Sequence, residues 1–154
     1  MRIVGLDVGE RRIGVAISDA TLTLARPVGV LPVAGPERDA VRVASAEIAR
    51  LGAEDEGVSA IIVGLPRHLD GSSSEMTVRV RMFADELGKQ TRLPITLQDE
   101  RLTSREAESR LAATEKGWRA RKAKIDAAAA AIILQDYLDV RPGRPIPIAV
   151  DPEI

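Results

Sequence analysis

Three acidic residues lie where the sequence predicts that strands or helices begin or end, and their types suit metal chemistry. Asp7 follows the apolar run of residues 3–6, Glu100 follows a short β-like segment, and Asp126 stands at the start of an alanine-rich helix. If the two strands run parallel in one sheet, Asp7 and Glu100 emerge at the same carboxyl edge, where open α/β sheets bind ligands. Three carboxylates repel one another unless a divalent cation neutralises them, and oxygen ligands suit Mg2+ or Mn2+.

Two such ions roughly 3.5–4 Å apart can activate a water molecule and stabilise the leaving oxygen in phosphodiester cleavage. The pattern therefore predicts nuclease chemistry, with Asp7, Glu100 and Asp126 as the catalytic residues and as the ligands of two Mg2+ or Mn2+ ions. Taken alone, each acid has a simpler interpretation. Asp7 could hold a strand end, Glu100 could form a surface ion pair, and Asp126 could be an ordinary acid at a helix N-terminus. Their agreement on one sheet edge favours the catalytic interpretation.

The residues around these acids add less. Gly5 and Gly9 flank Asp7 without side chains, which leaves room for a ligand or a second strand to approach the backbone closely. The single histidine, His68, lies in a polar loop with no second histidine or cysteine nearby, and we assign it no metal role.

A basic segment precedes Asp126 and predicts a surface that binds the phosphates of nucleic acid. We expect it to be a loop, with a solvated flexible loop as the simpler alternative. Arg11, Arg12 and Arg101, with Arg105, could extend the surface. Contacts of this kind recognise phosphates rather than base edges, so they predict recognition by shape. The basic residues of the segment are Lys116, Arg119, Arg121, Lys122 and Lys124.

The hydrophobic pattern predicts one alternating α/β domain. Strands are expected at residues 3–7, 13–18 and 24–31, the third at an edge because of its prolines. A helix over residues 36–52, a strand over 59–66 and a helix capped by Ser72 and Glu75 follow. A strand ending near residue 99, a helix over 103–113 and a last helix over 124–138 complete the domain. The expected fold is a five-stranded mixed sheet with helices on both faces, the later two strands being parallel to the first.

Composition limits the other possibilities. The chain has 154 residues, no cysteine and a formal net charge of −1, so nucleic acid must be bound by a local basic patch. Aromatic residues make up 2%, which argues against a platform that stacks bases. No apolar run is long enough to cross a bilayer, and we expect a cytoplasmic protein without a membrane partner. The predicted helices offer no second apolar stripe, which predicts a monomer or a weak homodimer.

Four motifs in order resemble the bacterial YqgF/RuvX family. They are residues 5–9 with 12–16, residues 63–66 with 70–72, residues 99–104, and residues 124–130. The resemblance runs from about residue 2 to 139 and implies an RNase H-like three-layer fold for residues 1–139. It also implies a cytoplasmic nuclease in which Asp7, Glu100 and Asp126 are the metal-binding acids. The proline-rich tail, residues 140–154, matches no motif of the family.

Members of the family are described as nucleases that process the 5′ end of pre-16S ribosomal RNA, and also as Holliday junction resolvases. The expected substrate is therefore structured RNA in ribosome biogenesis, with branched DNA as the alternative. Two other classes were weighed. An actin-like ATPase would use the first motif but needs a second lobe, and a non-cleaving nucleic-acid-binding module of the same fold would lack the three acids.

Overall fold

The computed structural model describes residues 1–35, 37–66, 73–99 and 118–140. Its strands are β1 (Arg2–Val8), β2 (Arg12–Ser18), β3 (Ala25–Pro32), β4 (Val58–Leu65) and β5 (Ile95–Asp99). Its helices are α1 (Glu37–Gly52), α2 (Glu75–Thr91) and α4 (Trp118–Val140). Several predicted features lie outside the described residues. They are the helix over residues 103–113, the tail from residue 141, and the residues His68, Glu100, Arg101, Arg105 and Lys116.

The five strands form one mixed sheet in the order β3-β2-β1-β4-β5. β1 pairs antiparallel with β2, and β2 with β3, whereas β1 with β4 and β4 with β5 are parallel pairs. This arrangement confirms the predicted mixed sheet, and it places β3, with its prolines, at one edge. The carboxyl ends of β1, β4 and β5 therefore lie along the same side of the sheet.

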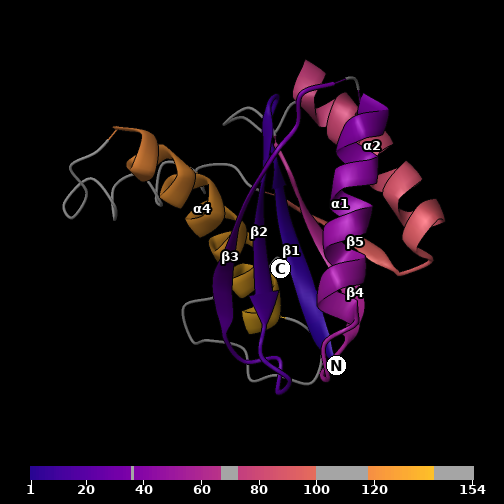
Figure 1. Ribbon diagram of the computed structural model, residues 1–154, viewed down its shortest axis with the longest axis vertical. Coiled ribbons are helices and arrows are strands. Elements are labelled where there is room, and N and C mark those ends of the chain that lie inside the picture. The colour runs from indigo at the N-terminus through magenta and orange to yellow at the C-terminus, as the bar shows by residue number, and fades with distance from the viewer. Residues whose placement is uncertain (36, 67–72, 100–117, 141–154) are drawn as a thin grey trace.

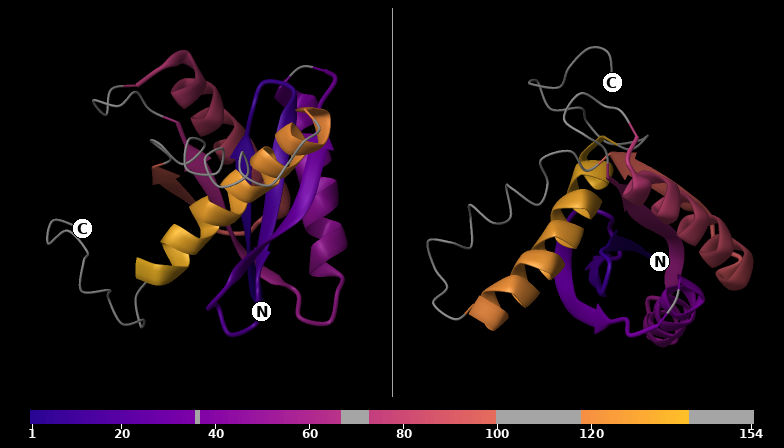
Figure 2. Two further views of the ribbon diagram at one scale, coloured as in Figure 1. Left: turned by 90° about the vertical axis from the view of Figure 1, so that its left-hand side faces the viewer. Right: turned by 90° about the horizontal axis from the view of Figure 1, so that it is seen from above.

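Helices cover both faces of the sheet, as predicted (Figures 1 and 2). On one side, which we call the α1/α2 face, α1 and α2 bury Val4, Leu6 and Val63 of the central strands. On the other, the α4 face, Ile3 and Ile62 pack with Leu134 of α4. Successive strand residues point to opposite faces, so each central strand divides its side chains between two cores. This division explains why the central strands contain almost no polar positions.

The start of α2 differs from the predicted capping box of Ser72 and Glu75. The N-cap is Ser74, whose hydroxyl accepts a hydrogen bond from the Thr77 backbone N–H at 3.2 Å, while the Thr77 hydroxyl accepts from the Ser74 N–H at 2.8 Å. Thr77 is fully buried and also donates to the Pro66 carbonyl. The polar run of serines offered several capping residues, and this tertiary contact with Pro66 is what selects Ser74.

The outer face of α2 corrects a second expectation. Val78 and Met82 are 54% and 56% exposed, so α2 does carry a second apolar stripe, on the face opposite its buried one. The buried stripe consists of Thr77, Val80, Phe83, Ala84 and Leu87. Helical periodicity identifies the buried positions Val80, Phe83 and Leu87 correctly, whereas Val78 and Met82 are apolar residues outside that pattern.

The basic segment is helical from Trp118 onward rather than a loop, and Asp126 therefore lies about two turns inside α4 instead of opening it. Residues 118–124 contain no glycine or proline, and arginine, lysine and alanine all have high helix propensity. The cluster of like charges suggested a loop, but propensity prevails here. In the described residues, no helix is long and apolar enough to span a membrane.

Candidate active site

Asp7 is half-buried at the carboxyl end of β1, on the α4 face of the sheet. Its face follows from alternation, because Ile3 belongs to the core beside α4 whereas Val4 and Leu6 belong to the core beneath α1 and α2. The predicted position of this acid at a strand end is confirmed. The apolar run of β1 that precedes it is buried from Arg2 to Leu6, so Asp7 sits where the dry interior meets the edge of the sheet.

Glycines stand on both sides of Asp7. Gly14 of β2 is its direct partner in the antiparallel register. On β4, Leu6 pairs with Val63, so the next residue, Gly64, lies beside Asp7. Neither neighbour has a side chain, which leaves space around the carboxylate on the α4 face. Gly14 and Gly64 could not be assigned to the site from sequence, because their place beside Asp7 depends on strand register.

Gln98 extends this row to a fourth strand. It pairs with Gly64, and it lies on the α4 face because the preceding pair, Ile62 with Thr96, includes Ile62 of the core beside α4. Gln98 is half-buried and brings a side-chain amide to the same row as Asp7. Gln98 was not among the residues predicted from sequence either. The alternation of apolar and polar residues over 95–98 was the signal that could have placed Gln98 on the opposite face from Leu97.

Helix α4 packs directly against β1 at Gly5, two residues before Asp7. A Cβ atom placed on Gly5 would lie 2.8 Å from the Leu134 Cβ and 3.1 Å from the Ala130 carbonyl oxygen. The close neighbour at Gly5 is thus a helix, not the ligand or strand that the sequence suggested. At Gly9 the neighbour is the hairpin turn itself, where the Gly9 N–H donates to the Arg12 carbonyl at 2.8 Å.

The contacts of α4 also fix its direction across the sheet. Gln135 accepts a hydrogen bond from the Ala25 N–H at 2.9 Å, and Ala25 pairs with Ser18 near the start of β1. Ala130 and Leu134 lie at Gly5, farther along β1. The N-terminal part of α4 therefore lies nearer the carboxyl end of β1 than the C-terminal part does. Asp126 precedes Ala130 by four residues, one helical turn.

Arg12 and Arg11 occupy the hairpin beside Asp7. Arg12 begins β2 two residues before Gly14, so it shares the α4 face with Asp7 as a diagonal neighbour, about 7–8 Å away between Cα atoms. Arg11 is exposed, and its carbonyl accepts from the Val33 N–H at 2.8 Å, which ties the hairpin to the end of β3. The structure thus places Arg12 on the α4 face together with Asp7, and Arg11 at the tip of the hairpin.

The remaining predicted residues are only partly described. Arg119, Arg121, Lys122 and Lys124 lie on the first turns of α4, which project beyond the β3 side of the sheet (Figure 1). Of the three acids, only Asp7 has a described side chain, and the described residues contain no group of three metal-binding side chains. Glu100 directly follows Asp99, the last residue of β5, which pairs with Leu65.

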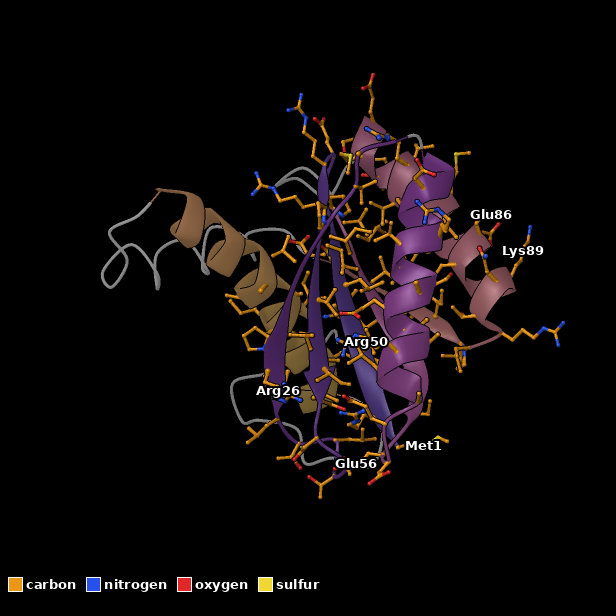
Figure 3. All side chains as sticks on the ribbon, in the orientation of Figure 1. Met1, Arg26, Arg50, Glu56, Glu86 and Lys89 are labelled. Atoms are coloured by element: carbon orange, nitrogen blue, oxygen red, sulfur yellow. The ribbon has the colours of Figure 1, made fainter. Side chains whose placement is uncertain are left out.

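Two carboxyl groups with displaced pKa values lie at the opposite end of the molecule. A hydrogen bond from the Arg2 guanidinium, 2.8 Å from the Glu54 carboxylate, lowers the pKa of Glu54. The backbone N–H of Thr23 and then the Thr21 hydroxyl lower the pKa of Asp19. Both are structural contacts: they hold the start of β1 and the turn after β2 (Figure 3 labels nearby Met1 and Glu56).

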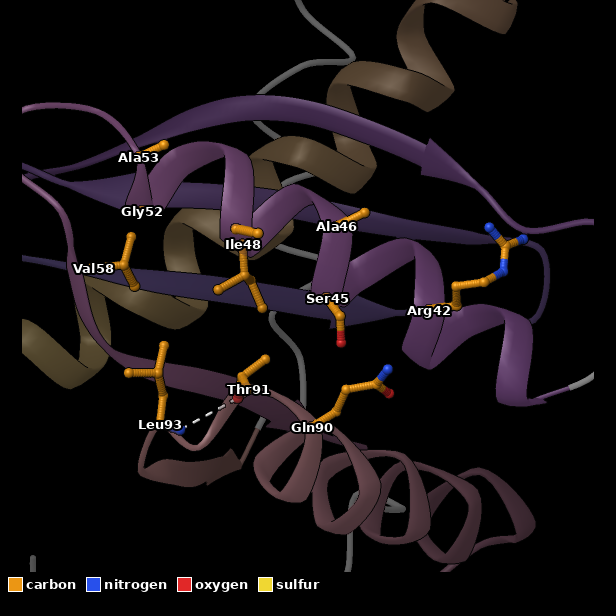
Figure 4. A pocket seen from close by; sticks show the side chains of 11 residues that line it. Arg42, Ser45, Ala46, Ile48, Gly52, Ala53, Val58, Gln90, Thr91 and Leu93 are labelled. Atoms are coloured by element: carbon orange, nitrogen blue, oxygen red, sulfur yellow. Dashed lines mark hydrogen bonds between the residues drawn. The ribbon is translucent and has the colours of Figure 1, made fainter.

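A hollow of about 760 Å3 between the C-terminal halves of α1 and α2 lies apart from Asp7 (Figure 4). Ile48, Val58 and Leu93 line it, with Arg42 and Gln90 also at its walls. It opens on the α1/α2 face, whereas Asp7 lies on the α4 face, so we do not assign it to the site.

Two solved structures with similar folds place this arrangement in a class. RuvC of Thermus thermophilus aligns with a TM-score of 0.54 at 13% identity, covering 92% of this chain and 96% of that chain. The same protein in complex with a Holliday junction substrate aligns with a TM-score of 0.53 at 16% identity, covering 93% and 96%. Likeness at this identity establishes the fold, and the chain has the predicted RNase H-like fold.

The family follows from sequence. A model described as "RuvX: Holliday junction resolvase" matches residues 1–140, and the chain belongs to this family. A Chloroflexus aggregans protein named "Putative pre-16S rRNA nuclease" is 46% identical over 139 residues, covering 90% of this chain and 94% of the relative. One of the same name from Anaeromyxobacter sp. is 42% identical over 143 residues, covering 92% and 98%. The predicted family, the nuclease class and nucleic acid as the partner are confirmed.

Proposed function

We propose that this protein is a divalent-metal-dependent endonuclease that trims the 5′ end of pre-16S ribosomal RNA in the cytoplasm. The observation that carries this proposal is the placement of Asp7. It is a carboxylate at the carboxyl end of the central strand, with glycines on both neighbouring strands. Helix α4 packs on the same strand at Gly5 through Ala130, and Asp126 lies one helical turn before Ala130. The names of the relatives supply the substrate.

The donor set fits a pair of hard cations. Asp7, Glu100 and Asp126 would hold Mg2+ or Mn2+, which supply charge neutralisation and a more acidic water when bound. The glycine pair leaves space beside the Asp7 carboxylate on the α4 face. Glu100 is joined to the end of β5, two strands from Asp7, and Asp126 lies on α4 toward the same edge.

The residues of this chain would divide the work of phosphodiester hydrolysis. The basic positions on α4 and the hairpin residues Arg11 and Arg12 hold the phosphate backbone against the acids, which would otherwise repel it. Water attacks phosphorus opposite the 3′ oxygen, and the P–O3′ bond breaks. The products are a 3′-hydroxyl and a 5′-phosphate. Gln98 lies at the far end of the row from Arg12 and can hydrogen-bond a sugar or phosphate oxygen there.

Resolution of four-way DNA junctions is the second candidate. The description of the matching family and the junction-bound RuvC of similar fold favour it. Resolution requires paired cuts on two strands, and therefore a two-fold dimer with two sites on one substrate. Trimming of precursor RNA requires one cut, which suits a monomer or a weak homodimer, and we favour the RNA.

The test compares both substrates with matched variants. A 5′-extended fragment of 16S precursor RNA and a synthetic four-way junction are incubated with the full chain in Mg2+, Mn2+ or Ca2+. Asp7→Asn should lose cleavage of whichever substrate the protein cuts while it still binds, because the amide keeps the shape without the charge. Asp55→Asn, which removes an exposed acid in the turn after α1, should cleave like the wild type. An Asp7→Asn variant that cleaves normally in saturating Mg2+ would remove Asp7 from the mechanism.

A further inference from the structure

The outer face of α2 carries a stripe of four exposed residues that neither the fold nor the proposed site uses. Val78, Arg81, Met82 and Asp85 follow one another at intervals of three, one and three residues, which puts them on one face of the helix. This face is opposite the buried stripe centred on Val80 and Leu87. Figure 3 shows the nearby Glu86 and Lys89 also pointing away from the sheet.

The stripe borders a hollow at the β5 side of the sheet. Arg81, Met82, Ala84 and Asp85 of α2 line a depression of about 420 Å3 together with Ile95 and Leu97 of β5. Among the described strands, β5 is the last in the sheet order and pairs with β4. Single exposed apolar residues are common on protein surfaces. Here, however, Val78 and Met82 are adjacent on the helix and continue into the half-buried Ile95 and Leu97.

The charges of the stripe suit a second copy of this chain. Arg81 and Asp85 lie one turn apart on the same face, with Met82 between them. A two-fold axis that crosses α2 near residues 82 and 83 would place the Arg81 of each copy opposite the Asp85 of the other, which gives two equivalent ion pairs. The two Met82 side chains would then meet near the axis. An isologous interface requires self-complementarity of this kind. We propose that two copies associate through antiparallel α2 helices at this stripe.

The size of the stripe sets the strength of the association. Residues 78–85 span about 10 Å of helix, whereas stable interfaces bury about 800 Å2 on each partner. Four side chains and the border of β5 provide less than this area. The dimer is therefore weak and forms only at high protein concentration. This inference does not depend on the proposed nuclease reaction.

Cross-linking tests the geometry cleanly because the chain contains no cysteine. Met82→Cys introduces one thiol at the proposed axis, and Ala46→Cys introduces one on the exposed side of α1 as a matched control. Under mild oxidation, Met82→Cys should form a disulfide-linked dimer at concentrations where Ala46→Cys stays monomeric. Equal cross-linking of the two variants at all concentrations, or none for Met82→Cys, would overturn the proposal.

Charge exchange tests the pairing. In sedimentation velocity over a range of concentrations, the wild type should shift toward a dimer as concentration rises. Arg81→Glu alone and Asp85→Arg alone should each abolish that shift, because like charges then face each other. The double variant should restore it. Circular dichroism of each variant confirms folding. A dimer that persists in both single variants, or fails to return in a folded double variant, contradicts this interface and indicates another occupant of the stripe.

Discussion

Asp7 owes its setting to neighbours that have no side chains. Gly14 and Gly64 flank Asp7 on the neighbouring strands, and Gly5 lets α4 pack closely against β1. The sequence was sufficient to make Asp7 a candidate, because an acid after a continuous apolar run is costly without a partner. It could not reveal the flanking glycines or Gln98, since these become neighbours only when the register of β1, β4 and β5 is known.

Arg2 and Glu54 provide a prediction at the scale of one ion pair. The guanidinium of Arg2 is buried and donates to the Leu51 carbonyl at 3.0 Å. It also donates to the Glu54 carboxylate, which balances its charge. The pKa of Glu54 is lower in the folded chain than in the unfolded one. Its stabilising contribution is therefore present above the unfolded-state pKa, about 4.3, and is lost as the pH falls through the folded-state pKa.

Glu54→Gln should accordingly lower the melting temperature at neutral pH, and the gap to the wild type should close in acid. Thermal unfolding from pH 7 down to about pH 3 would follow the gap across the ordinary range of a glutamate. Glu56→Gln, two residues away and exposed, should show no such pH-dependent gap. A gap of constant size for Glu54→Gln at all pH values would mean that the ion pair is not its source.

The contact between α4 and β1 is the element-scale link between core and site. Gly5→Ala should destabilise the fold by about 1–3 kcal/mol, because the added methyl group overlaps Leu134 and the α4 backbone. Gly29→Ala is the matched control on β3, where a Cβ would meet nothing within 4 Å. Urea unfolding measures both variants. A Gly5→Ala protein as stable as Gly29→Ala would show that α4 can shift without cost.

The helical start of α4 sharpens the prediction for phosphate binding. Spacing along α4 places positions 119, 122 and 126 on one stripe with Ala130, whereas position 121 lies about 140° from position 126 around the helix. Replacing Arg119 and Lys122 with alanine should flatten the plot of log affinity against log salt by roughly 0.7–0.9 per lost phosphate contact. Arg121→Ala should change this slope less. Equal slopes for all the variants and the wild type would support the solvated alternative.

The elements themselves show which sequence signals were sufficient. Apolar runs predicted β1, β2 and β4, because strands buried on both faces leave few alternatives. Less continuously apolar segments predicted the partly exposed strands β3 and β5. Boundaries were predicted less well where local signals compete. Several serines could cap α2, and the basic residues before Asp126 fit both a charged loop and a helix. Tertiary contact decided the first case and helix propensity the second.

At the scale of the whole molecule, the described members of both hydrophobic cores all lie before residue 140. Their buried members run from Ile3 to Leu138, and the family model ends at residue 140. We propose that residues 1–139 are the folding unit. Removing residues 141–154 should change the unfolding free energy by less than about 0.5 kcal/mol, or 1–2 °C in melting temperature. Calorimetry measures this, and a loss beyond about 5 °C would assign the tail a place in the fold.

The proposed dimer bears on the substrate. A two-fold axis perpendicular to α2 reverses the direction of that helix, and with it the direction of the strands that it covers. The carboxyl edges of the two sheets then face opposite ways, which separates the two Asp7 residues instead of bringing them to one junction. Association through α2 therefore agrees with single cuts in RNA, carried out independently by each copy.

The order of the elements along the chain also times the appearance of activity during synthesis. The described members of the core beneath α1 and α2 all lie before residue 99, so they leave the ribosome before α4 does. Helix α4, which carries Asp126, emerges last and closes the opposite face. A nascent chain beside ribosomal RNA therefore lacks one of the three proposed acids. With Asp126 in its proposed role, the chain would cut only after translation has passed α4.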